Sequence, residues 1–245
     1  MKALVLAGGF AKRMWPITLE VAKPLLEVAG RPVLDYLMER LSEVEVDRVV
    51  LTVNRRFEGQ FREWARSRGY DVELIVEEAM SEEEKLGAVA GIANALPAVE
   101  GDDCLILAGD NVFDFSLKGF IDRYGELGRP LIGLYDVGDL GKARRYAVVE
   151  VDDGWRVRRV VEKPSEPWGS LIAVCIYALP PRELSSVRDY LAQGGSRDAP
   201  GKFIEWLVDR TDVYGYLFEG AWFDIGDPSS YAEADRYFRG AISTL

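Results

Sequence analysis

The sequence contains no histidine among its 245 residues. This absence excludes the usual general base, the usual zinc ligand and the Ser-His-Asp triad together. Acid–base or metal chemistry must therefore fall to Asp, Glu, Lys, Arg or the backbone. Cysteine is nearly absent too. Cys104 and Cys175 lie in apolar runs and form no spacing motif, which predicts buried thiols in a reducing compartment.

Long apolar runs and an excess of positive charge are also missing. No run is long enough to span a bilayer, and the chain enters an apolar strand at once, without a signal peptide. The net charge is −11, which argues against non-specific binding to nucleic acids or anionic membranes. We therefore expect a cytoplasmic protein with no nucleic-acid and no membrane partner. A small anionic ligand could still be held in a local basic pocket.

The hydrophobic pattern predicts the fold class. Hydrophobic residues make up 48% of the chain, and runs rich in Val, Ile and Leu recur at wide spacing, at 2–7, 48–53, 71–76, 103–108 and 130–137. Several are apolar on consecutive residues, as expected for strands covered on both faces. Helical patterns lie between them. This alternation predicts an α/β protein with a doubly wound, mostly parallel sheet.

The second half of the sequence has a different character. Two strand patterns flank Asp152-Asp153-Gly154, which is a hairpin signal, and another buried strand is expected at 170–179. Helices are expected at 181–193, at 201–209 and from 228 to about 239. No repeat or linker is visible. We therefore expect one domain over 1–245, in which residues 128–245 add a mixed lobe to the sheet of residues 1–127.

The first strand runs directly into Gly8 and Gly9, followed by Arg13 and Lys23. A strand that ends in glycines before a helix leaves free backbone N–H groups at the carboxyl edge of the sheet, and such groups suit phosphate. Arg13 offers a planar fork of donors and Lys23 a point charge. The stretch is neither a Walker A loop nor a G-x-G-x-x-G fingerprint. The glycines alone fit an ordinary tight turn equally well.

Two acidic residues occur in settings that suit a metal. Asp110 follows a buried strand and Gly109, so it is a Mg²⁺ ligand candidate at the sheet's carboxyl edge. Asp224 is flanked by Trp222, Phe223 and Ile225, and a carboxylate in such an apolar setting needs a partner. Either residue could instead cap a turn or a helix.

The stretch LAGGFAKRMWPITLEVAKPLLEVAGRP (6–32) resembles the signature of the sugar-1-phosphate nucleotidylyltransferases, the group that includes glucose-1-phosphate thymidylyltransferase and mannose-1-phosphate guanylyltransferase type enzymes. That signature is L-A-G-G-x-G-[TS]-R-[LM]-x-P-x-T followed by K-P. The resemblance implies a Rossmann-like nucleotide-diphospho-sugar transferase fold, with a nucleotide-binding half and a sugar-phosphate-binding half. It also implies that Gly8, Gly9 and Arg13 hold the nucleotide phosphates and that Lys23 neutralises charge between the two substrates.

Later segments extend the resemblance. G-D-[NT] and W-x-D-[IT]-G-[TD]-P imply that Asp110 and Asp224 hold one Mg²⁺, and E-K-P implies that Glu162 and Lys163 bind the sugar phosphate. Leu86 and Gly87 match a segment near the base. The residues that we expect to bind substrate are Leu6, Gly8, Gly9, Gly87, Ala147, Glu162, Lys163 and Cys175, and those that we expect to act in catalysis are Arg13, Lys23 and Lys163.

The sequence departs from the family pattern at three small residues. Ala11 stands where the third glycine of the phosphate loop is usual, and this would cost about 1 kcal/mol if its φ is positive. Ala147 and Cys175 replace glycines on the sugar side. No clear Gln marks the base pocket. The base and the sugar therefore stay open.

The resemblance implies transfer of a nucleotidyl group from an NTP to a sugar 1-phosphate, with Mg²⁺ as cofactor, giving an NDP-sugar and pyrophosphate. A homo-oligomer is compatible with the family, and we expect no further acyltransferase domain. Two alternatives stay open: a non-catalytic regulatory homologue that binds a nucleotide sugar, and a cytidylyltransferase that acts on a non-sugar phosphate. A positive φ at Ala11 would favour the regulatory alternative.

Overall fold

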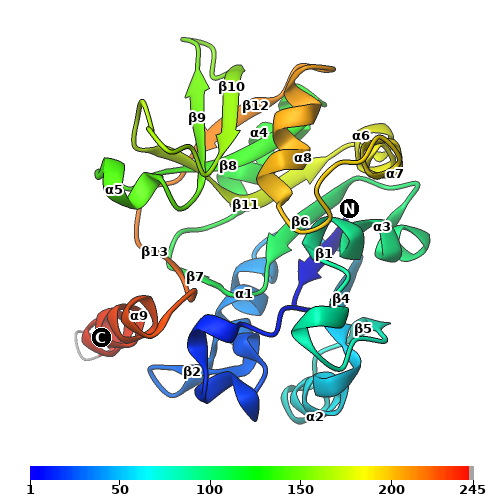
Figure 1. The fold of residues 1–245 in the computed structure, drawn as a ribbon, viewed down its shortest axis with the longest axis vertical. Coiled ribbons are helices and arrows are strands. Elements are labelled where there is room, and N and C mark those ends of the chain that lie inside the picture. Colours follow the sequence, from blue (N-terminus) through cyan, green and yellow to red (C-terminus); the bar gives the residue numbers. More distant parts are fainter. Residues whose placement is uncertain (243–245) are drawn as a thin grey trace.

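A nine-stranded sheet crosses the middle of the protein (Figure 1). The structure is a computed structural model, and it describes residues 1–242. Four parallel strands lie in the order β6-β1-β4-β5. They are β1 (Lys2–Leu6), β4 (Arg48–Asn54), β5 (Val72–Glu77) and β6 (Cys104–Ala108). Each corresponds to an apolar run of the sequence, which confirms the predicted parallel sheet.

Antiparallel strands extend the sheet beyond β6. β11 (Leu171–Leu179) pairs with β6, and the hairpin of β9 (Ala147–Val151) and β10 (Val157–Glu162) continues from it. β8 (Leu131–Asp136) also pairs with β11, and β12 (Tyr214–Leu217) runs parallel to β8. The second half therefore forms the mixed lobe that its sequence predicts.

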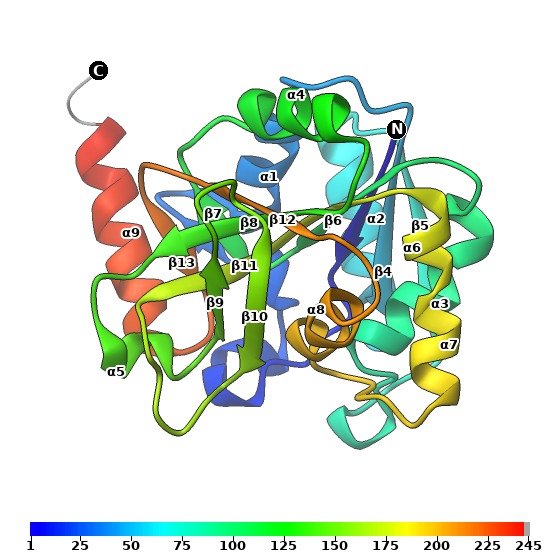
Figure 2. The same ribbon diagram turned by 90° about the horizontal axis from the view of Figure 1, so that it is seen from above.

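Helices cover both faces of the sheet (Figure 2). One face carries α1 (Val33–Leu41), α2 (Glu58–Arg68) and α4 (Lys118–Leu127). The other carries α3 (Ala88–Val99), α6 (Pro181–Ser185), α7 (Val187–Ala192) and α8 (Pro200–Val208). Neighbouring strand residues point to opposite faces: Leu105 joins the first core and Ile106 the second. This arrangement explains why the strands are apolar on consecutive residues.

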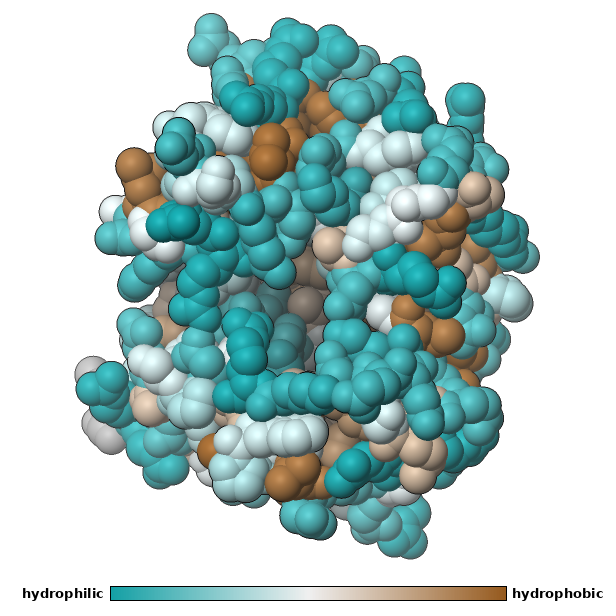
Figure 3. All heavy atoms as spheres, in the orientation of Figure 1, coloured by the Kyte–Doolittle hydropathy of each residue, from teal (hydrophilic) through white to brown (hydrophobic). Residues whose placement is uncertain are grey.

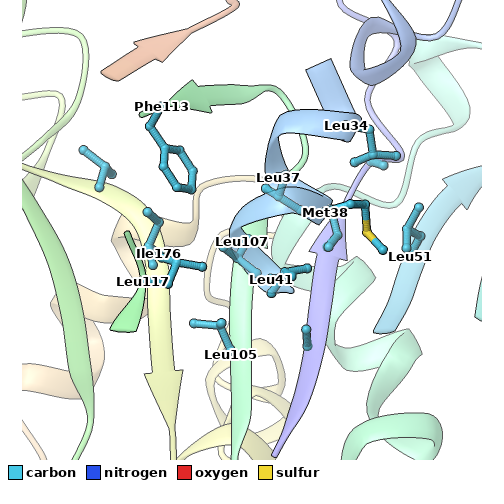
Figure 4. Packing of buried hydrophobic residues seen from close by; sticks show 14 of the residues in the cluster. Leu34, Leu37, Met38, Leu41, Leu51, Leu105, Leu107, Phe113, Leu117 and Ile176 are labelled. Carbon is cyan, nitrogen blue, oxygen red and sulfur yellow. The ribbon is translucent and has the colours of Figure 1, made fainter. Parts of the chain in front are cut away.

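The packing of α1 on the sheet illustrates how the first core forms (Figure 4). Leu34, Leu37 and Leu41 recur at helical spacing and so lie on one face of α1. They share this core with Leu105 and Leu107 of β6. All five side chains are at most 3% exposed, and burying a side chain of this size stabilises the fold by about 1.5–3 kcal/mol.

Smaller elements complete the fold around the open end of the sheet. β2 (Glu27–Val28) pairs with β3 (Arg31–Pro32), and β7 (Asn111–Phe113) pairs with β13 (Trp222–Asp224). The remaining helices are α5 (Leu140–Ala143), α9 (Pro228–Ile242) and five short 3₁₀ helices, η1 (Lys12–Met14), η2 (Ile17–Leu19), η3 (Lys23–Leu25), η4 (Arg55–Phe57) and η5 (Glu82–Glu84). Within residues 1–242, every helix is too short or too polar to cross a lipid bilayer.

The strand order predicts where a ligand binds. From β1 the chain continues to β4 and β5 on one side, and β6 then lies on the other side. The segments that follow β1 and β6 therefore diverge at their carboxyl ends. Open α/β sheets bind ligands in the crevice at such a switch point. Gly8 and Asp110 follow these two strands.

Candidate functional site

A cavity of about 540 Å³ lies at the carboxyl ends of the parallel strands. Figure 3 shows this face of the molecule hollowed near its middle, with hydrophilic side chains around the hollow. The cavity extends from β4 and β5 across β1 and β6 to the mixed lobe. It is lined by every site residue that the sequence predicts, namely Leu6, Gly8, Gly9, Arg13, Lys23, Gly87, Asp110, Ala147, Glu162, Lys163, Cys175 and Asp224.

The loop after β1 contains a strained residue. Ala11 has φ 51° and ψ 50°, in the left-handed region. Its carbonyl oxygen accepts hydrogen bonds from the Met14 N–H (2.8 Å) and the Thr18 hydroxyl (3.0 Å). A non-glycine residue keeps this conformation only where its surroundings hold it. This positive φ favours the alternative of a non-catalytic regulatory homologue. The replacement of the usual glycine by Ala11 leaves the loop with a strained backbone.

Ala11→Gly is expected to raise the free energy of unfolding by about 0.5–1 kcal/mol, because glycine relieves the left-handed strain but adds entropy to the unfolded chain. Ala29 also has φ 51° but lies outside the cavity, so Ala29→Gly is the matched control. Urea unfolding should find similar gains for both variants. A gain of tenfold or more in turnover for Ala11→Gly alone would indicate that strain at Ala11 suppresses activity.

Two cations of the first segment reach the two predicted metal ligands. Lys23 forms an ion pair with Asp110. Arg13 lies beside Asp224, since a Cβ atom placed on Gly226 would lie 3.2 Å from both the Arg13 Nη2 atom and the Asp224 Oδ2 atom. By contrast, Lys12 pairs with the exposed Glu83 at the rim. Arg13 and Lys23, but not Lys12, therefore lie against the acidic centre of the cavity, which is formed by Asp110 and Asp224.

Asp110 and Asp224 come together although 114 residues separate them. β13 pairs with β7 so that Asp224 lies opposite Asn111, and the Ile225 N–H donates to the Asp110 carbonyl at 3.0 Å. Burial, and then the negative charge of Asp110, raise the pKa of Asp224 to about 6, against the opposing effects of Lys23 and Arg13. Two neighbouring carboxylates of this kind attract a cation.

The donor set fits a hard divalent cation such as Mg²⁺, which prefers carboxylate, phosphate and water oxygens. Among residues 1–242, no group of three or more His, Cys, Asp or Glu side chains is placed to hold a metal. Asp110 and Asp224 would thus hold Mg²⁺ together with oxygens from substrate and water. That is the usual way in which one or two carboxylates bind Mg²⁺ beside phosphates.

Glu162 and Lys163 lie at the end of β10, on the mixed-lobe side. The Lys163 Nζ atom is 3.6 Å from the Glu162 Oε1 atom, and the lysine side chain is far more exposed than the glutamate. Gly201 of α8 makes room for Glu162, because a Cβ atom there would lie 2.0 Å from the Glu162 Oε2 atom. The sequence pattern alone assigned no chemistry to Gly201. A side chain at this position would displace Glu162 and would also contact the Ala147 Cβ atom, which lies 2.8 Å from the same point.

Cys175 and Ala147, the two residues that replace glycines on the sugar side, differ in their backbone conformation. Cys175 has φ 52°, where the pairing of β11 with β8 shifts register between Ala173 and Tyr177. A glycine would be unstrained there. Ala147 lies within the regular strand β9, so the replacement of glycine at that position adds only a methyl group. Ala11 and Cys175 therefore both take a conformation that suits the glycine of the family pattern.

Other residues line the cavity without having been singled out in the sequence: Thr52, Glu77, Lys85, Arg145 and Asp198. Lys85 pairs with Asp198 at 2.8 Å and with Glu82 at 2.7 Å, so the segment 82–88 closes one wall against the residues before α8. Glu82 therefore belongs to the cavity wall, although an acidic run there suggests a solvated loop. Glu77 could have been found by the signal that marked Asp110, an acid at the end of a parallel strand.

Glu77 predicts a pH dependence of stability. Burial raises the pKa of its carboxyl from 4.5 to about 7, so the folded protein holds a proton that the unfolded chain releases. As the pH rises through this window, the free energy of unfolding should fall by about 1–3 kcal/mol. Glu77→Gln cannot ionise, so we expect it to be more stable than the parent protein above the folded pKa and similar below the unfolded pKa. Denaturant titrations that find the same difference at both ends of the window would contradict this.

Comparison with known proteins agrees with the site geometry. A family model described as nucleotidyl transferase matches residues 2–239. A probable mannose-1-phosphate guanylyltransferase 2 of Arabidopsis thaliana is 29% identical over 99% of this chain and 66% of its own length. A UTP–glucose-1-phosphate uridylyltransferase of Synechocystis is 27% identical over 99% of this chain and 64% of its own length. The chain thus spans just under two thirds of the length of these relatives.

Solved structures share the fold. A putative glucose-1-phosphate thymidylyltransferase from Bacillus anthracis superposes with a TM-score of 0.87 at 20% identity, covering 98% of this chain and 95% of the other. A UDP-glucose pyrophosphorylase superposes with a TM-score of 0.82 at 18% identity, covering 98% of each chain. The family match extends over nearly the whole length, and the predicted resemblance to the sugar-1-phosphate nucleotidylyltransferases is confirmed. The chain belongs to the nucleotidyl transferase family.

Proposed function

We propose that this protein transfers a nucleotidyl group from an NTP to a sugar 1-phosphate in a Mg²⁺-dependent reaction. One observation carries the proposal: the cations Arg13 and Lys23 meet the carboxylates Asp110 and Asp224 in one cavity, at the switch point of the sheet. The relatives named guanylyltransferase and uridylyltransferase act on mannose 1-phosphate and glucose 1-phosphate by name. A hexose 1-phosphate is therefore the acceptor that we propose for this chain.

In the proposed reaction, a phosphate oxygen of the sugar 1-phosphate attacks the α-phosphorus of the NTP. A new phosphorus–oxygen bond forms, and the bond to the β-phosphate breaks with its electron pair leaving on pyrophosphate. Mg²⁺ held by Asp110 and Asp224 would offset negative charge on the phosphate oxygens. The attacking group is already an anion near neutral pH, so no general base is needed. This fits a chain without histidine.

The residues of the cavity would act by positioning and charge neutralisation. Backbone N–H groups around Gly8 and Gly9 and the Arg13 guanidinium would hold the triphosphate. Lys23, between the loop and the acidic centre, would reduce the repulsion between the two substrates. Lys163, with its exposed side chain, would bind the acceptor phosphate.

Two alternatives belong to the same cavity. The positive φ of Ala11 favours a non-catalytic homologue that binds a nucleotide sugar for regulation. The cavity contains both cations and both carboxylates on which the proposed reaction depends. This argues against the regulatory homologue, because a protein that only binds the product does not need two carboxylates that repel each other. A cytidylyltransferase that acts on a non-sugar phosphate is the second alternative. The residues Ala147 and Cys175, which replace glycines at the acceptor end, are compatible with a different acceptor.

A panel of NTPs and phosphate acceptors tests the proposal. Purified protein with Mg²⁺ should release pyrophosphate with at least one NTP when a hexose 1-phosphate is present, and EDTA should stop the release. Turnover with phosphocholine or inositol phosphate, and none with hexose 1-phosphates, would favour the second alternative. Nucleotide-sugar binding without turnover of any pair would favour the regulatory one. The cytoplasmic location, a homo-oligomer and the division at residue 127 stay predictions.

A further inference from the structure

Asn54 is a buried polar residue behind the loop after β1, and the proposed mechanism does not use it. It ends β4, it is 0% exposed, and it lies outside the cavity. Its side-chain amide makes two hydrogen bonds: Nδ2 donates to the Gly8 carbonyl at 3.2 Å, and Oδ1 accepts from the Phe57 N–H at 3.0 Å. The second bond fixes the orientation of the amide, because an N–H group needs an acceptor. The amide nitrogen therefore faces Gly8.

This hydrogen bond orients the peptide group between the two glycines. Gly8 lines the cavity, whereas Asn54 lies behind it, so the Gly8 carbonyl points away from the cavity. The Gly8–Gly9 peptide is trans, and in a trans peptide the C=O and N–H groups point in opposite directions. The Gly9 N–H therefore points toward the cavity, where it can donate to a phosphate oxygen.

The neighbouring backbone of the loop is also open to a ligand. Within residues 1–242, the N–H groups of residues 8–11 have no backbone acceptor. A Cβ atom on Gly9 would meet no protein atom within 4 Å, so the backbone is bare at that point. Successive N–H groups without partners form a concavity that suits an anion. A peptide group that faced the wrong way would place a carbonyl oxygen among these donors.

Asn54 supplies the one hydrogen bond that fixes this peptide group. The Ala7 N–H donates to the Thr52 carbonyl at 3.0 Å, which holds the chain before the glycines. After them, the buried rings of Phe10 and Phe57 pack with their centroids 6.2 Å apart. Within residues 1–242, however, only Asn54 forms a hydrogen bond to the peptide group between the glycines. Glycine leaves that group free to rotate unless a neighbour holds it.

We infer that Asn54 is a positioning residue for the phosphate loop, an inference that rests on the proposed function. By holding the Gly8 carbonyl, it keeps the Gly9 N–H directed at the triphosphate. Rotation of the peptide would direct a carbonyl oxygen at the anion and replace an attractive dipole by a repulsive one. Asn54 acts without touching the substrate. Its amide suits this position because it donates to the loop and accepts from η4 at the same time.

Asn54→Ser separates the two hydrogen bonds of the amide. Serine is an N-cap residue as good as asparagine, so it can keep the bond from the Phe57 N–H, but its shorter side chain cannot also reach the Gly8 carbonyl. We expect the affinity for inorganic tripolyphosphate, measured by calorimetry with Mg²⁺ present, to fall about tenfold or more. In steady-state kinetics, KM for the NTP should rise more than KM for the hexose 1-phosphate. Asn54→Thr, which also keeps an N-cap residue, should behave in the same way.

Val53→Ala is the matched control for a general loss of stability. Val53 precedes Asn54 in β4 and is fully buried in the first core. Its truncation leaves a cavity and should lower the unfolding midpoint at least as much as Asn54→Ser does. The tripolyphosphate affinity of Val53→Ala should nevertheless equal that of the parent. Equal losses of affinity in Val53→Ala and Asn54→Ser would overturn the inference, as would an unchanged affinity in Asn54→Ser.

Binding and turnover together separate this inference from the proposed function. If no NTP gives pyrophosphate, the proposed function fails, but a weaker binding of tripolyphosphate by Asn54→Ser still supports the role of Asn54. If the parent turns over and Asn54→Ser matches it in both tripolyphosphate affinity and KM for the NTP, the proposed function holds and the inference fails. A parent protein that binds no tripolyphosphate would also overturn the inference, because the loop would then present no donors to an anion.

Discussion

Replacing Asp224 by Asn is expected to lower Mg²⁺-dependent pyrophosphate release by about a thousandfold while the fold stays intact. Asn keeps the shape of the side chain but removes the charge that would hold the cation beside Asp110. Removing one of two repelling carboxylates should not destabilise the protein, so its unfolding midpoint should equal or exceed that of the parent. Asp110→Asn should lower turnover to the same extent, but it also removes the partner of Lys23, so its unfolding midpoint should lie below that of Asp224→Asn. Steady-state kinetics at several Mg²⁺ concentrations measures the effect.

Asp136→Asn is the control for both metal-site variants. Asp136 also ends a strand, β8, but it is exposed and lies outside the cavity. Its replacement should leave turnover within about twofold of the parent, as is usual for surface changes. Full activity in both Asp110→Asn and Asp224→Asn would show that the pair of carboxylates does not hold the metal. The proposed mechanism would then lose its central element.

Lys23→Gln is expected to lower kcat by about 10²–10³-fold, a loss of the size found when one preorganised group that stabilises developing charge is removed. The lysine pairs with Asp110 in a partly buried setting, where its charge is poorly screened. Its loss would leave repulsion between the NTP and the sugar phosphate uncompensated in the transition state. We therefore expect kcat to change more than KM for either substrate.

Lys12→Gln is the matched control for Lys23→Gln, since both residues belong to the same segment. Lys12 pairs with Glu83 at the exposed rim, where a salt bridge contributes little. Its replacement should change kcat less than about fivefold. Equal losses in the two variants would mean that the segment acts through its overall charge. The specific placement of Lys23 against Asp110 would then be irrelevant to the reaction.

Local sequence patterns predicted the parallel strands well, and the structure brings the residues of the predicted phosphate loop to the cavity. The apolar runs became strands, and the central ones are apolar on consecutive residues because both of their faces are buried. Gly8, Gly9 and Arg13, which line the cavity, could be singled out because they follow the first strand within a few residues. Asp110 was found for the same reason at the end of β6. Signals of this kind lie within a few residues and need no knowledge of distant contacts.

Other features were missed because they depend on contacts between distant segments. Gly201 matters because Glu162, 39 residues earlier, and Ala147 would both contact a Cβ atom at that position. Glu77 carries the local signal of an acid at a strand end, but its burial against Gly8 and Gly91 depends on how α3 packs on the sheet. The left-handed backbone at Ala11 is also set by hydrogen bonds to residues after it. The glycine that is usual at this position made a positive φ possible, but the alanine alone could not decide it.

The amino-acid sequence thus decided which segments become strands and which charged residues follow them, since hydrophobic periodicity and turn chemistry act over a few residues. It also decided, through the absence of histidine, that the chemistry depends on carboxylates, lysine and arginine. Only the tertiary structure decided that β13 pairs with β7, which brings Asp224 to Asp110, and that the end of β5 faces the same cavity. The physical reason is that distances between remote segments are set by strand order and packing, which no local interaction specifies.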